Sequence, residues 1–151
     1  MLESIYEKFG YYAERLYYKL IEGFGAFDQM NLAMKKLRQD LPKEIGERKV
    51  LKVLDRLTGE LRDAQTGELF FTEDERTVIH ARPSGFFTED ERTVIHARPS
   101  GTEPKMKYYT NVKGRLQEKS KAEIMQEAEI LEKSIAATFE EILSTIKVDV
   151  F

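Results

Sequence analysis

A segment of sixteen residues occurs twice in direct succession, and the two copies are identical. The first copy spans Phe70–Gly85, the second spans Phe86–Gly101, and each reads FFTEDERTVIHARPSG. Successive side chains of a strand point to opposite faces of a sheet, so a shift by an even number of residues leaves every side chain on its original face. Because sixteen is even, strand packing alone cannot select which copy is used.

The connection to the next segment distinguishes the two copies. Only the second copy continues into TEPK at 102–105, and from there into a predicted strand over Lys105–Val112. We therefore expect Val94, Ile95 and Ala97 to lie in the central strand beside Lys105–Val112, joined to it by a tight turn.

The first copy, 70–85, is then a duplicated insert. Its Val78, Ile79 and Ala81 are not expected to fill the same place in the sheet. The insert lengthens the connection after Leu57, and roughly doubling a flexible loop costs only about 0.6 kcal/mol of closure entropy. Since its TVIHA stretch is apolar and β-prone, it could add to a sheet edge or pair with another chain.

The spacing of apolar residues predicts three helices, at Leu2–Phe9, 26–41 and 120–146. The last one begins with the capping box SKAE at 120–123. It continues with an apolar stripe of helical period, formed by Ile124, Ala128, Leu131, Ile135, Phe139, Ile142 and Ile146.

Strands are predicted where β-branched and aromatic residues gather. They are expected at Tyr12–Glu22, at Lys49–Leu57, in the RTVIHAR stretch of the repeat and at Lys105–Val112. In the last strand, alternation predicts one face formed by Met106, Tyr108, Thr110 and Val112. The other face is then formed by Lys105, Lys107, Tyr109 and Asn111.

This order of elements predicts an α+β fold in a single domain, 1–151. Short turns between strands favour antiparallel pairing. We expect an antiparallel sheet of four or five strands, covered on one face by the helices 26–41 and 120–146. A length of 151 residues is typical of one domain.

Composition excludes several classes of protein. A net charge of −3 argues against a dedicated nucleic-acid-binding protein, which needs a basic face. The absence of cysteine excludes disulfides and thiolate metal sites. The sequence contains no apolar run long enough to span a membrane, and charges stand where a signal peptide needs an apolar stretch. We therefore expect a cytoplasmic protein without a nucleic-acid or membrane partner.

The segment RPSGTEPK at 98–105 joins two predicted strands and suits a phosphate group. Arg98 offers a planar fork of donors, and a bend at Gly101 can aim backbone N–H groups into a concavity for an anion. Ser100 and Thr102 add hydroxyl groups, and Lys105 adds a point charge. A polar hairpin loop without a ligand fits the same residues.

The segment ARPSGTEPKMKYYTNVKG resembles the signature of the C-terminal domain of the α-D-phosphohexomutases, the phosphoglucomutase and phosphomannomutase family. The segments LESIYEKFGYY, LRQDLPKEIG and KVLKVLDRLTGE are similar to stretches that precede this signature in bacterial members. Outside one copy of the repeat, the resemblance covers nearly the whole chain.

The resemblance implies the fourth domain of a four-domain isomerase of carbohydrate metabolism. Such enzymes move a phosphate between positions 1 and 6 of a hexose through a bisphosphate, using a phosphorylated serine in the first domain and Mg²⁺ in the second. Residues 1–10 would be the junction with a preceding domain. The sugar phosphate would be bound by Arg98, Ser100, Gly101 and Thr102, with Lys105 a weaker candidate.

The chain itself is predicted to be inactive. It has no Ser-His-Asn-Pro string for a phosphoserine and no Asp-x-Asp-x-Asp-Arg loop for Mg²⁺, so we expect no catalytic residue and no cofactor in it. The acidic stretches Glu73–Arg76 and Glu89–Arg92 suit solvated turns better than a metal site. His80 and His96 occupy one repeated strand position and lack a nameable catalytic partner.

The expected partners are a hexose phosphate and the missing domains of the full-length enzyme. Two alternatives stay open at this point. The chain could be a natural or engineered fragment that carries a duplicated strand and binds no ligand. It could also be a scaffold module that self-associates through the spare strand.

Overall fold

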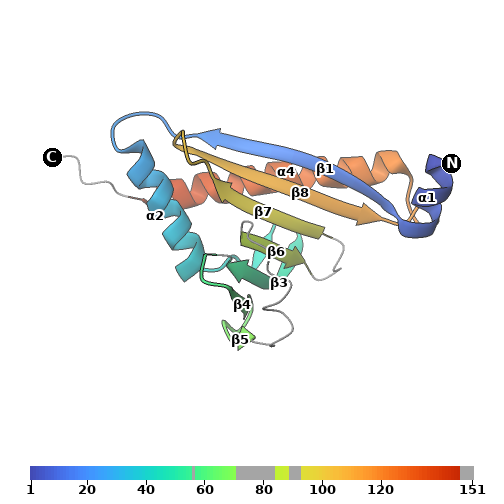
Figure 1. Cartoon of the computed structure of the whole chain (residues 1–151), viewed down its shortest axis with the longest axis horizontal. Helices are drawn as coiled ribbons and strands as arrows, with labels where there is room; N and C mark the ends of the chain where they lie inside the picture. Colours follow the sequence, from blue (N-terminus) through green and yellow to red (C-terminus); the bar gives the residue numbers. More distant parts are fainter. Residues whose placement is uncertain (56, 71–83, 89–92, 147–151) are drawn as a thin grey trace.

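The computed structural model describes residues 1–55, 57–70, 84–88 and 93–146. Its described helices are α1 (Leu2–Phe9), α2 (Ala26–Gln39) and α4 (Lys121–Ser144). Its described strands are β1 (Tyr11–Leu20), β2 (Glu44–Ile45), β3 (Arg48–Asp55), β4 (Glu60–Asp63), β5 (Leu69–Phe70), β6 (Ser84–Thr88), β7 (Thr93–Pro99) and β8 (Lys105–Gly114). Figure 1 shows the long strands β1 and β8 side by side with α4 running behind them.

The strands form a sheet in the order β1-β8-β7-β6-β3-β4-β5, and β2 pairs with β3 outside this path. Every described pair is antiparallel. The predicted α+β class and the antiparallel pairing are thus confirmed. The expected number of four or five strands is wrong, because turn-rich segments add short strands, of which β2 and β5 have two residues each.

The helix α4 covers β1 and β8, and α2 contacts both α4 and β7. The capping box is present: the Ser120 hydroxyl accepts a hydrogen bond from the Glu123 N–H at 3.2 Å, and the Glu123 carboxylate accepts one from the Ser120 N–H at 2.6 Å. Five residues of the predicted stripe are buried, namely Ile124, Ala128, Leu131, Ile135 and Phe139.

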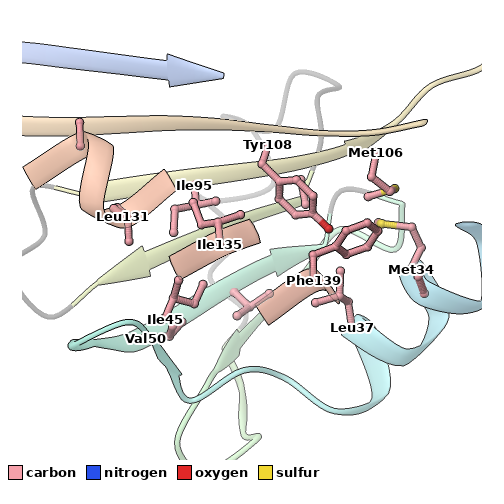
Figure 2. Packing of buried hydrophobic residues seen from close by; sticks show 14 of the residues in the cluster. Met34, Leu37, Ile45, Val50, Ile95, Met106, Tyr108, Leu131, Ile135 and Phe139 are labelled. Carbon is pink, nitrogen blue, oxygen red and sulfur yellow. The ribbon is translucent and has the colours of Figure 1, made fainter. Parts of the chain in front are cut away.

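The strand β8 buries the face that alternation predicted. Met106, Tyr108, Thr110 and Val112 are all buried. Figure 2 shows Tyr108 beside Phe139 of α4, and their ring centroids are 5.2 Å apart. Burial also raises the pKa of Tyr108, so its phenol stays neutral in the core. The opposite face of β8 is therefore directed away from the helices.

The second copy of the repeat forms β7, as expected from its connection to TEPK. Within β7, Ile95 pairs with Thr110 and Ala97 pairs with Tyr108 of β8, and both Ile95 and Ala97 are buried. Val94 also lies in β7, where it pairs with Asn111. The predicted central strand is confirmed.

The ends of the first copy belong to the sheet, which the sequence did not indicate. Phe70 pairs with Leu61 in β4, and Ser84 and Gly85 begin β6, which pairs with both β7 and β3. The insert 70–85 is therefore not wholly outside the fold. Its Val78, Ile79 and Ala81 lie outside the described residues.

Matched substitutions in the two copies test this assignment. Ile95 is 1% exposed, so Ile95→Asp should lower the free energy of unfolding by about 3 kcal/mol or more, because it removes apolar burial and buries a carboxylate. The same change at Ile79 should cost much less, since the place beside β8 is already filled. Urea denaturation of the two variants measures the difference.

A chain with a single copy of the repeat is the control. In it the first copy can no longer replace a damaged second copy by slipping sixteen residues, so the full cost of Ile95→Asp should be seen. Equal losses for Ile79→Asp and Ile95→Asp in the complete chain would contradict the assignment of one working strand.

Candidate functional site

The loop between β7 and β8 is fixed by three backbone hydrogen bonds. The Ser100 N–H donates to the Lys105 carbonyl at 2.8 Å and closes the hairpin. The Lys105 N–H donates to the Glu103 carbonyl at 2.7 Å, and the Ile21 N–H donates to the Pro104 carbonyl at 2.8 Å. The loop is thereby tied to the end of β1, at the end of the sheet where α2 begins (Figure 1).

These bonds correct one expectation about the donors of the loop. The Ser100 N–H is used inside the hairpin, so it cannot also bind an anion; only the Ser100 hydroxyl remains for that role. Gly101 and Thr102 are exposed, and within the described part of the chain their N–H groups make no hydrogen bond. Among the predicted site residues of the loop, Gly101 and Thr102 therefore keep their backbone donors available.

The expectation that the bend of the loop needs a glycine at position 101 is wrong. Its φ is not positive, so the bend does not depend on the special backbone freedom of glycine. A Cβ atom built at Gly101 would meet no atom within 4 Å. The missing side chain instead leaves the backbone open to close approach, which is a common use of glycine next to a ligand.

Arg98 is an unpaired cation in β7, three residues before Gly101. Five other arginines in the described ranges each form an ion pair: Arg15, Arg38, Arg48, Arg62 and Arg115. Arg98 is exposed, and among the described residues it forms neither an ion pair nor a side-chain hydrogen bond. Its guanidinium can therefore offer a full fork of donors to an oxyanion.

A second unpaired cation, Lys107, lies directly opposite Arg98 in the register of β7 and β8. Within the described ranges its ammonium group has no partner either. Like charges directly opposite each other on a sheet repel, and a bound anion would relieve that repulsion. The sequence reasoning missed Lys107 as a site residue, although alternation had already put it on the same face as Lys105.

Lys105 is less available than Lys107. Its ammonium group lies 3.3 Å from a carboxylate oxygen of Glu103 and 4.6 Å from the ring centroid of Tyr18. The ion pair and the cation–π contact both engage the positive charge of Lys105. The predicted residues Ser100, Gly101 and Thr102 therefore lie in one loop, with Arg98 near the end of β7 and Lys105 at the start of β8.

The other sequence candidates do not form a site in the described ranges. His96 is half-buried within β7 and pairs with Tyr109. His80, Glu73–Arg76 and Glu89–Arg92 lie outside the described residues. Over the part of the chain that is described, no group of three or more His, Asp or Glu side chains is arranged to hold a metal ion. No helix in that part is long and apolar enough to cross a membrane.

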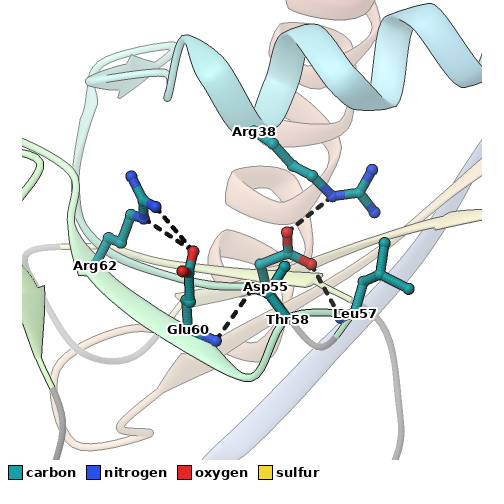
Figure 3. A network of polar contacts seen from close by, with 6 residues as sticks. All are labelled: Arg38, Asp55, Leu57, Thr58, Glu60 and Arg62. Atoms are coloured by element: carbon teal, nitrogen blue, oxygen red, sulfur yellow. Dashed lines mark hydrogen bonds and ion pairs between the residues drawn. The ribbon is translucent and has the colours of Figure 1, made fainter.

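A cavity of about 290 Å³ between α2 and the β3–β4 hairpin also contains basic side chains. Its two arginines are already neutralised: Arg38 pairs with Asp55 at 2.8 Å, and Arg62 pairs with Glu60 at 2.8 Å (Figure 3). Asp55 also accepts a hydrogen bond from the Leu57 N–H at 3.0 Å. The Arg38–Asp55 pair joins α2 to β3, whereas the Arg62–Glu60 pair lies within β4. Both pairs leave less charge for an anionic ligand than the β7–β8 loop does.

Comparison with known proteins found no match to this chain, neither among protein-family models nor among curated sequences. The resemblance to the phosphohexomutases therefore stays a hypothesis that rests on the quoted segments.

The role of Gly101 can be separated from the stability of the fold. Gly101→Ala should leave the melting temperature unchanged or raise it slightly, because the native backbone accepts alanine and the unfolded chain loses freedom. The added methyl group should weaken phosphate binding at least about threefold, as it stands where the ligand approaches the backbone. Calorimetric melting and an NMR titration with inorganic phosphate measure the two effects. A stable variant with undiminished phosphate binding would argue against a ligand at this loop.

Proposed function

We propose that this chain binds the phosphate group of a hexose phosphate, as the C-terminal domain of a phosphohexomutase-type isomerase. The observation that carries the proposal is the pair of facing, unpaired cations, Arg98 and Lys107, next to the open backbone of Gly101. The similarity of the RPSGTEPK segment to the family signature supports the same ligand.

The chemistry of the loop suits a phosphate dianion. A guanidinium binds two phosphate oxygens in a fork, and an ammonium group adds a compact charge from the facing strand. The N–H groups of Gly101 and Thr102 and the hydroxyl of Ser100 supply further donors to the remaining oxygens.

The proposed role is positioning rather than chemistry. In a phosphohexomutase two phosphate positions of one hexose are used, and holding the phosphate that does not react would fix the one that does. Such positioning can lower an activation barrier by several kcal/mol. The phosphoserine and the Mg²⁺ would come from other domains, so the partners proposed here are a hexose phosphate and those domains.

Phosphate binding should be weak and should depend on both cations. A Kd in the millimolar range, about −4 kcal/mol, is expected for a site that is only part of a cleft. Arg98→Ala and Lys107→Ala should each weaken the binding of inorganic phosphate at least about tenfold, because a charge-assisted hydrogen bond is worth roughly 1.5–3 kcal/mol. An NMR titration at constant ionic strength should shift the amides of Gly101 and Thr102 most.

Lys113→Ala is the matched control, because Lys113 lies on the same face of β8, opposite Tyr12 at the far end of the strand pair. It should leave the phosphate affinity unchanged. Equal weakening by all three substitutions would mean non-specific attraction to a basic surface rather than a site.

The isolated chain should not interconvert glucose 1-phosphate and glucose 6-phosphate, even with Mg²⁺ and glucose 1,6-bisphosphate. The reason is that the sequence contains neither the nucleophile string nor the metal loop of the family. A coupled assay measures the interconversion against a control without protein. Turnover that survives repurification would contradict the proposed non-catalytic role.

A further inference from the structure

The two unpaired cations belong to a row of three side chains that crosses the open face of the sheet. Tyr18 of β1 pairs with Lys107 of β8, and Lys107 pairs with Arg98 of β7. Directly opposed residues of antiparallel strands point to the same face, with Cβ atoms about 4.5–5.5 Å apart. The face is the one away from α4, since the next residues in sequence, Tyr108 and Ala97, are buried beneath the helices.

Tyr18 is exposed, whereas its neighbour Tyr17 is partly buried. Tyr17 packs against Tyr108, with ring centroids 5.9 Å apart, and belongs to the edge of the core. Tyr18 keeps 57% of its surface exposed, although it is a large aromatic residue. Packing of the core therefore does not account for an aromatic ring at this position.

The ring of Tyr18 is nevertheless held in place. The Lys105 ammonium group lies 4.6 Å from its centroid, and the same group is held by Glu103 at the tip of the candidate loop. A lysine covers only one face of a tyrosine ring, so the ring keeps a second face and most of its exposed surface. The contact links the ring directly to the loop that is proposed to bind phosphate.

The spacing of the row matches a phosphate that is attached to a ring. Neighbouring strands are about 4.8 Å apart, so a phosphate held between Lys107 and Arg98 lies about one and a half strand spacings, roughly 7 Å, from the strand that carries Tyr18. This separation is comparable to the reach from a sugar phosphate group to its own pyranose ring. The C–H groups on one side of a pyranose carry slight positive charge, and an aromatic face carries the negative charge that attracts them.

We propose that Tyr18 is a platform for the sugar ring, against which the hexose stacks while Arg98 and Lys107 hold its phosphate. This inference rests on the proposed function and adds to it a contact with the sugar itself. It assigns a ligand-binding role to β1, a strand that contributes no residue to the loop.

The stacking of the sugar on Tyr18 is tested by comparing a phosphate ligand that carries a sugar ring with one that does not. Inorganic phosphate and glucose 6-phosphate are titrated into the complete chain by NMR at the same pH and ionic strength. The unmodified protein should bind glucose 6-phosphate at least about fivefold more tightly than inorganic phosphate. Tyr18→Ala and Tyr18→Leu should abolish this preference and leave the Kd for inorganic phosphate within about twofold, whereas Tyr18→Phe should keep the preference.

Tyr12→Ala is the matched control. Tyr12 lies on the same strand and face, is 52% exposed, and also has a lysine over its ring, with the Lys113 ammonium group 5.4 Å from the centroid. It stands six residues away from Tyr18, about 20 Å along the strand, so its removal should change neither affinity.

The outcomes separate the inference from the proposed function. The inference about Tyr18 is wrong, and the phosphate site stands, in two cases. In the first, Tyr18→Ala and Tyr18→Leu fold and keep the preference for glucose 6-phosphate. In the second, they weaken the binding of both ligands equally. The same holds if the unmodified protein shows no preference. If the unmodified protein binds neither ligand, the proposed function fails and the inference fails with it.

Discussion

The contact between β8 and α4 is the interaction on which the rest of the structure depends. β8 is paired on both sides, with β1 and with β7, so it fixes the register of all three strands. Its buried face packs against α4, where Tyr108 meets Phe139 and Gly114 leaves room for Ile124. Because side chains alternate along a strand, burying this face forces Lys105, Lys107 and Tyr109 onto the other one. The charges of the candidate site are thus a geometrical consequence of the core.

The choice between the two copies of the repeat depends on the same contact. An even shift would satisfy the buried face of β7 equally well, so hydrophobic packing does not distinguish the copies. The hairpin does: the bonds from Ser100 to Lys105 and from Ile21 to Pro104 require a short loop that enters β8 directly. Only the second copy has that connection. The loop that is proposed to bind phosphate therefore also sets the register of the sheet.

Features that depend on spacing along the chain could be predicted from the sequence. Features that depend on how strands pair could not. The stripe of α4 and the two faces of β8 follow from spacing along the chain. The position of Lys107 opposite Arg98, the use of the Ser100 N–H inside the hairpin and the ion pair of Lys105 with Glu103 follow from register and loop geometry. Single-chain patterns contain no information on which residues face each other across strands. The strands β2 and β5 were not predicted from the sequence, because two residues are too few to show an alternating pattern.

The arginines of the cavity and the cations near the β7–β8 loop differ in their ion pairs. Arg38 and Arg62 sit in a cavity large enough for a small molecule, yet each is neutralised by a neighbouring carboxylate. Arg98 and Lys107 are adjacent, have no carboxylate partner within the described part of the chain, and repel each other. A fold gains nothing from keeping two facing cations unpaired, and surface ion pairs are easily formed by substitution. Their position close to Gly101 in the chain is the observation that supports the proposed anion site.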